Sequence, residues 1–130
     1  MENPTPMAKG AAQYAKILSE SLTTSEAGKR LNVQPSRVRQ RLLATPPELY
    51  GIQHEGEWRL PVFQFSKQGL VPNISAVIAK LPEGMDPVAV DNWFRLPKVD
   101  LEHGDQTLSP LEWLAQGLPA EPVAELAEDL

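Results

Sequence analysis

Cationic and hydrogen-bonding side chains are concentrated in one short stretch of this 130-residue chain. Residues 29–41 contain no acidic residue, and their basic residues are Lys29, Arg30, Arg37, Arg39 and Arg41. An arginine fork binds the O6 and N7 acceptors of guanine, and a glutamine amide binds adenine in a comparable bidentate way. The stretch therefore predicts contact with nucleic acid. The candidate contact residues there are Ser36, Arg37, Gln40 and Arg41, with Lys29, Arg30 and Arg39 as candidate phosphate contacts.

Two helices joined by a tight turn are expected to position these side chains. Thr23 and Glu26 form an S/T-x-x-E capping box, which is typical of a helix start. Asn32 suits the left-handed residue that ends such a helix. Pro35 suits the first turn of the next helix, which we expect to end before Pro46.

The second of these helices is expected to bury one face and expose the other. At 100° per residue, Val38 and Leu42 point to the same side. The roughly opposite side carries polar groups, namely Ser36, Arg37, Gln40 and Arg41. An aliphatic inner face with a donor-rich outer face is typical of a helix that lies in the major groove of DNA.

A β-hairpin is expected directly after this helix pair. The two short segments around Glu55-Gly56 flank a glycine-containing turn, which indicates a hairpin. Trp58 and Leu60 would face the core, while Arg59 between them is a further candidate phosphate contact. Acidic residues at the hairpin tip would repel phosphate, so we expect the helix to make most of the contacts.

The first half resembles a known DNA-binding family. Residues 22–43 (LTTSEAGKRLNVQPSRVRQRLL), followed by residues 56–65 (GEWRLPVFQF), resemble the MerR/excisionase-type winged helix-turn-helix. The resemblance implies a winged helix-turn-helix DNA-binding domain over residues 1–66 and a double-stranded DNA operator as its ligand.

The second half is expected to be helical. Asn73 is a candidate N-cap for a helix that includes Leu81, and Asp86-Pro87 starts another helix. Ser109 and Glu112 form a second capping box. Glu121-Pro122 opens a last helix. Few helix signals occur over residues 96–107, which are therefore expected to form a loop.

The second half is also acidic. Residues 81–130 contain only Arg95 and Lys98 as basic residues. The acidic residues are Glu83, Asp86, Asp91, Asp100, Glu102, Asp105, Glu112, Glu121, Glu125, Glu128 and Asp129. The chain's net charge of −5 therefore conceals a basic segment followed by an acidic one, which indicates two different partners.

This acidic half resembles a second family. Residues 91–94 (DNWF), residues 108–117 (LSPLEWLAQG) and Leu126-Ala127 are similar to the C-terminal domain of the Xre/MbcA/ParS antitoxins. The resemblance implies a RES-type toxin that consumes NAD as the partner of residues 67–130. The candidate partner-binding residues are Trp113, Glu121, Glu125, Glu128, Asp129 and Leu130. For Trp113 the alternative is core packing, and for the acidic residues it is a solvated helix face.

Several function classes are not expected. The chain has no cysteine, which excludes disulfides, cysteine-ligated zinc and thiol nucleophiles, and favours the reducing cytoplasm. No apolar run is long enough for a bilayer, so no membrane association is expected. His103 lacks the several convergent ligands of a metal site. Since no nucleophile and base pair or phosphate loop occurs, we expect neither an enzyme nor a cofactor.

The sequence thus predicts a mainly α fold with a small β-hairpin wing (α+β), in which a winged helix-turn-helix precedes a small helical domain. The favoured function is a homodimeric, DNA-binding repressor that acts as the antitoxin of a type II toxin-antitoxin pair. One alternative is a stand-alone regulator or excisionase-like factor whose second half serves dimerisation. A protein adaptor that no longer binds DNA is another.

Overall fold

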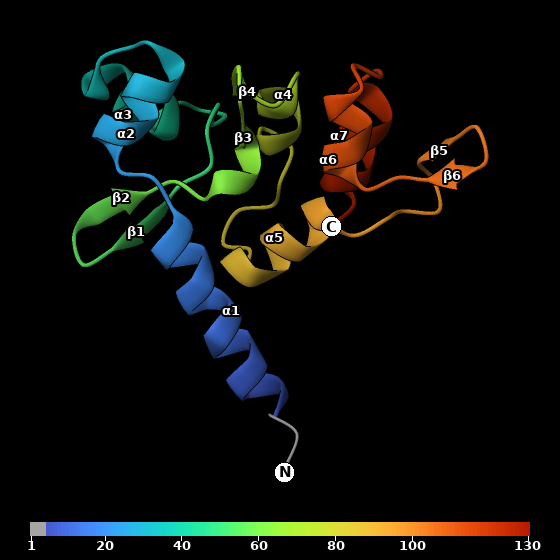
Figure 1. Ribbon diagram of the computed structural model, residues 1–130, viewed down its shortest axis with the longest axis horizontal. Coiled ribbons are helices and arrows are strands. Elements are labelled where there is room, and N and C mark those ends of the chain that lie inside the picture. Colours follow the sequence, from blue (N-terminus) through green and yellow to red (C-terminus); the bar gives the residue numbers. More distant parts are fainter. Residues whose placement is uncertain (1–4) are drawn as a thin grey trace.

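The computed structural model describes residues 5–130 and shows an α+β fold of short helices with small antiparallel hairpins (Figure 1). The Thr5 hydroxyl accepts a hydrogen bond from the Ala8 N–H at 3.1 Å and begins α1, Pro6–Glu20. In Figure 1 the N-terminal end of α1 projects away from the rest of the chain. Ile17, near the other end of α1, is buried.

The predicted helix pair is present as α2, Thr24–Leu31, and α3, Pro35–Leu43. The capping box is complete: the Thr23 N–H donates to Glu26 at 3.0 Å, and the Glu26 N–H donates to the Thr23 hydroxyl at 3.1 Å. The Thr23 backbone N–H, followed by the Thr23 hydroxyl, lowers the pKa of the Glu26 carboxyl group. Asn32 adopts the expected left-handed conformation at φ 59°.

Gly28 allows the turn between the two helices to close tightly. A Cβ atom at this position would lie 2.7 Å from the carbonyl oxygen of Val33. The Val33 N–H donates to the Gly28 carbonyl at 2.9 Å across the same contact. A side chain at position 28 would therefore push α3 away from α2.

The predicted hairpin is also present. Strands β1, Ile52–His54, and β2, Glu57–Arg59, pair antiparallel. Glu55 and Gly56 have φ values of 51° and 78°, the two left-handed residues of a type I′ turn. Leu60, just after β2, exchanges two 2.8 Å backbone hydrogen bonds with Leu22, just before α2. The wing is thus fixed directly to the helix pair.

A single-turn 3-10 helix, Val62–Gln64, leads from the wing into β3, Phe65–Ser66, and β4, Gly69–Leu70. The remaining helices are α4, Ile74–Ile78; α5, Pro87–Arg95; α6, Pro110–Ala115; and α7, Glu121–Glu128. Figure 1 shows α2 and α3 at one end, α6 and α7 at the other, and α4 between them.

Two expectations for the second half were wrong. Residues 96–107 are not all loop, because β5, Glu102–His103, pairs with β6, Gln106–Thr107. Asn73 makes no side-chain cap, because its φ of 58° departs from the extended conformation of an N-cap residue. Helix α4 also ends at Ile78, before Leu81.

Two apolar clusters form the core. The first joins α2, α3 and the wing through Ala27, Val38, Leu42, Leu49, Leu60 and Phe65. The second includes Val77, Val90, Leu114 and Val123 from the four later helices. Phe63, which follows the wing, belongs to the second cluster and stacks on Phe94 with ring centroids 4.6 Å apart. The two halves therefore pack against each other.

Helix α1 adds another link between the halves. The Gln13 side-chain amide donates to Asn92 on α5 at 2.6 Å. Across residues 5–130, no helix combines the length and apolar character needed to cross a membrane.

Candidate nucleic-acid interface

Helix α3 separates its apolar and polar residues as the sequence predicted. Val38 is 0% exposed and Leu42 is 7% exposed, so this face packs against α2 and the wing. The outward side chains are Ser36, Arg37, Arg39 and Gln40, all exposed, with Arg41 half-buried. The structure therefore brings the predicted base-reading residues onto the solvent side of one helix.

The polar groups on this helix have few competing partners. Arg37 donates to the Gln40 amide oxygen at 3.3 Å, a contact that is open to water. Among residues 5–130, neither Arg39 nor Arg41 takes part in an ion pair. Because no carboxylate neutralises them, these guanidinium groups keep a positive potential over the outer face of α3.

Lys29 is exposed in the last turn of α2. Together with Ser25 and Gln34 it lines a shallow polar depression where α2 meets the start of α3. A depression with an ammonium group and polar neighbours suits a phosphate oxygen.

Two other candidate phosphate contacts are less free. Arg30 donates to the Ser66 carbonyl at 3.3 Å and lies over the Phe65 ring at 5.9 Å from its centroid. Arg59 is half-buried and lies 4.0 Å from Glu57. Each must give up a contact within the protein before it reaches DNA, so Lys29 is the better placed of the three.

The wing tip is acidic and open to solvent. The side chain of Glu55 is 86% exposed and that of Glu57 is 71% exposed. His54 lies 3.8 Å from Glu55. Carboxylates in this position disfavour a phosphate approaching the tip, which leaves α3 as the surface with the most suitable charge.

The candidate partner-binding residues lie on α6, α7 and the residues beyond. Glu121, Glu125, Glu128 and Asp129 are exposed, and Leu130 is 47% exposed. Trp113 is half-buried against the second cluster, and its indole N–H donates to the Pro119 carbonyl at 2.7 Å. The one polar atom of the Trp113 side chain is thus satisfied inside the chain, and the acidic side chains are more accessible than this indole.

The described part of the chain offers no cluster of side chains suited to a metal ion. Residues 5–130 contain no group of three or more His, Cys, Asp or Glu side chains that could hold a metal ion. His103 instead lies edge-on to Trp113, with ring centroids 6.4 Å apart.

Sequence reasoning missed Gln64, a buried polar residue behind the wing. Its amide accepts a hydrogen bond from the Tyr50 N–H at 2.9 Å, and it donates to the carbonyls of Tyr50 at 2.7 Å and Pro61 at 3.0 Å. The available signal was a lone amide between Phe63 and Phe65 in an apolar stretch.

Comparison with known proteins shows the fold alone. No family model matches the chain, and no curated protein matches it. A solved structure, the NMR structure of Rv2175c, is similar to this chain with a TM-score of 0.56 and 19% sequence identity. The similarity covers 84% of this chain and 79% of that one. The arrangement of both halves therefore has a counterpart among solved structures.

Proposed function

We propose that this chain is a DNA-binding transcriptional regulator that inserts α3 into the major groove. The observation that carries the proposal is the division of α3 into a buried face, Val38 and Leu42, and an exposed face that includes Arg37 and Gln40. A helix of this kind, held by a preceding helix and a tight turn, is the reading element of helix-turn-helix proteins.

The charge distribution supports the same orientation. Lys29 lies beside the start of α3, where it would meet a phosphate at the groove edge. The acidic residues of α7 belong to the other end of the chain and would stay away from DNA (Figure 1). We propose that a homodimer binds DNA, because one short helix buries too little surface for specific affinity.

Replacing Arg37 or Arg41 with alanine is expected to weaken binding to a selected DNA site by about 1–3 kcal/mol, or roughly 5–150-fold. The loss of a bidentate base contact should also relax the sequence preference at one position. The site is first selected from a random duplex library, and affinities are then measured by fluorescence anisotropy at fixed salt.

Lys80→Ala is the matched control. Lys80 is exposed just beyond α4, so this substitution removes one positive charge at a site away from α3. It should keep the affinity of the original protein. If neither arginine variant changes the affinity or the selected sequence, α3 does not read DNA.

We further propose that the acidic surface of α7 binds a basic protein, a RES-type toxin, which would make this regulator an antitoxin. Support comes from four exposed carboxylates at Glu121, Glu125, Glu128 and Asp129, none of which forms an ion pair within residues 5–130. A stand-alone regulator, whose second half serves only dimerisation, is the alternative.

Reversing two of these charges, Glu125→Lys with Glu128→Lys, is expected to weaken toxin binding at least tenfold and to abolish growth rescue in cells that express the toxin. Removing α7 altogether would not be informative, because Val123 and Ala127 are 0% exposed in the core. The control is Glu102→Lys with Glu20→Lys, two exposed carboxylates outside α7. If the α7 variant still rescues growth, the toxin assignment is wrong. If the α7 variant still binds DNA, the regulator proposal is retained.

A further inference from the structure

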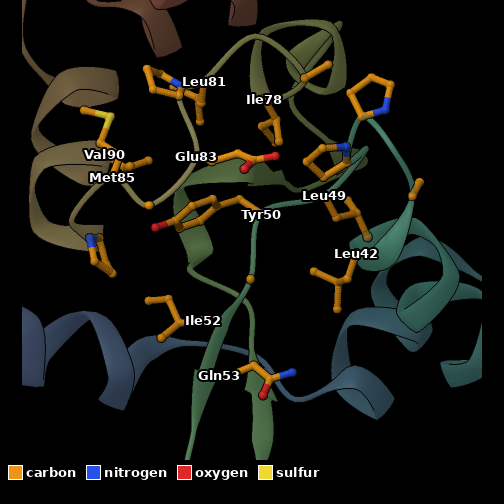
Figure 2. Close-up of a pocket in the computed structure, with 18 of the residues that line it drawn as sticks. Leu42, Leu49, Tyr50, Ile52, Gln53, Ile78, Leu81, Glu83, Met85 and Val90 are labelled. Atoms are coloured by element: carbon orange, nitrogen blue, oxygen red, sulfur yellow. The ribbon is translucent and has the colours of Figure 1, made fainter.

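A cavity of about 640 Å³ lies between the helix-turn-helix half and the second half of the chain. Helix α3 contributes Leu42 to its wall, and the wing contributes Ile52 and Trp58. The opposite wall comes from α4 and the segment before α5, including Ile78 and Met85. Figure 2 shows these elements surrounding one space. A volume of this size is in the range of pockets that hold small organic molecules.

The cavity is lined mostly by apolar residues and carries a single negative charge. Glu83 is the charged residue among its lining residues, and no lysine, arginine or histidine lines it in the described chain. Glu83 is exposed, which places it at the mouth, and it forms no ion pair within residues 5–130. In Figure 2 its side chain extends over the middle of the cavity.

Tyr50 adds an aromatic face and a hydroxyl group to the same wall. Burial, followed by the nearby charge of Asp86, raises the pKa of Tyr50 to about 12. The phenol therefore stays neutral, and a second carboxylate lies close enough to influence it. Two aromatic residues, Tyr50 and Trp58, and the Glu83 carboxylate line one apolar space, which favours a positive guest over a neutral or negative one.

We propose that this cavity is the binding site of a flat organic cation, such as an aromatic ammonium or quinolinium compound. The rings of Tyr50 and Trp58 provide faces for the apolar part of the ligand. The Glu83 carboxylate compensates its charge at the mouth. An organic anion would be repelled by Glu83, and a neutral compound would gain no attraction from that carboxylate.

The position of the cavity suggests what such a ligand does. Leu42 is on the candidate recognition helix and Trp58 is on the wing, so one bound molecule touches both elements. A ligand that binds more tightly to one relative position of α3 and the wing stabilises that position. The affinity for DNA then changes by the difference in the ligand's affinity between the positions. This effector role rests on the proposed function, whereas ligand binding itself does not.

The test compares three probes of similar shape with the full chain: N-methylquinolinium, 1-methylnaphthalene and 1-naphthoate. Binding is followed by isothermal titration calorimetry without DNA. We expect the cation to bind about tenfold or more tightly than the neutral probe, and the anion to bind least. Equal affinity for the cation and the neutral probe, or no binding by any probe, would overturn the proposal.

Two variants test the location. Glu83→Gln is expected to remove the preference for the cation. Ala79→Leu places a larger side chain in the cavity and is expected to reduce binding of both the cation and the neutral probe. Glu102→Gln removes an exposed carboxylate outside the cavity and should leave binding unchanged. If the cation binds Glu83→Gln and Ala79→Leu as well as it binds the original protein, the site lies elsewhere and the proposal fails.

The effector role is tested separately with the selected DNA site. Saturating N-methylquinolinium should change the DNA affinity at least threefold for the original protein and leave it unchanged for Ala79→Leu. Cation binding without any change in DNA affinity would refute the effector role and keep the ligand site. A protein that binds the cation but no DNA would refute the proposed function alone.

Discussion

Replacing Gln64 with leucine is expected to lower the free energy of unfolding by about 2–6 kcal/mol. Gln64 is 0% exposed, and its amide makes hydrogen bonds with both backbone groups of Tyr50 and with the Pro61 carbonyl. Leucine has a similar volume but no polar atom. The Tyr50 N–H and C=O would then lose their partner, at a cost of about 1–3 kcal/mol for each unsatisfied group.

Urea unfolding, followed by far-ultraviolet circular dichroism, measures this effect. Gln68→Leu is the control, because Gln68 is exposed and its side chain makes no hydrogen bond within residues 5–130. This substitution should change the free energy of unfolding by less than about 0.5 kcal/mol. A loss below about 1 kcal/mol for Gln64→Leu would mean that water replaces the missing amide.

The same substitution connects stability with the candidate ligand site. Tyr50 lines the cavity, and Gln64 holds its backbone from behind. A shift of Tyr50 would alter the cavity wall without changing any residue that faces the ligand. Gln64 is therefore a positioning residue for the cavity.

The helix-turn-helix and its wing were predictable because their signals are local. The capping box of Thr23 and Glu26 joins residues three apart, and Asn32 ends α2 through its own backbone conformation. The Glu55-Gly56 turn likewise specifies the hairpin by local dihedral angles. Each of these features could be read from a few consecutive residues.

Features that depend on distant partners were not predictable. The two residues of β5 and the two of β6 are too few to show an alternating pattern. Asn73 is a good N-cap residue by type, yet the chain there adopts a left-handed conformation. The cavity is lined by Leu42 of α3 on one side and by Met85 before α5 on the other, a combination that no periodicity encodes.

The candidate DNA-contacting surface is predictable to a different degree. Sequence periodicity places Arg37 and Gln40 outside and Val38 inside, and the structure agrees. Periodicity does not show that Arg30 is held by Ser66 and Phe65, because those contacts bridge α2 to the later β3 strand. DNA contact by each residue stays a prediction that the alanine variants test.

Replacing Phe94 with alanine is expected to lower the free energy of unfolding by about 3–5 kcal/mol. Phe94 is 0% exposed on α5, stacks on Phe63 at 4.6 Å and meets Trp93 edge-on at 4.8 Å. Alanine removes the whole ring and leaves a void that close-packed neighbours fill only in part. Leu96→Ala is the control, because Leu96 is 54% exposed near the same helix end.

The effect of Phe94→Ala also shows how far the two halves fold together. Phe63 follows the wing directly, so loss of its stacking partner should destabilise the helix-turn-helix half as well. Hydrogen exchange of α2 and α3 amides, compared with that of α5, reports each half separately. We expect protection to fall by the same free energy in both, because Leu70 packs against both clusters and Phe63, just after the wing, belongs to the second. Unchanged protection in α2 and α3 would mean that the first half folds independently, and a ligand in the cavity would then act on the orientation of two stable units.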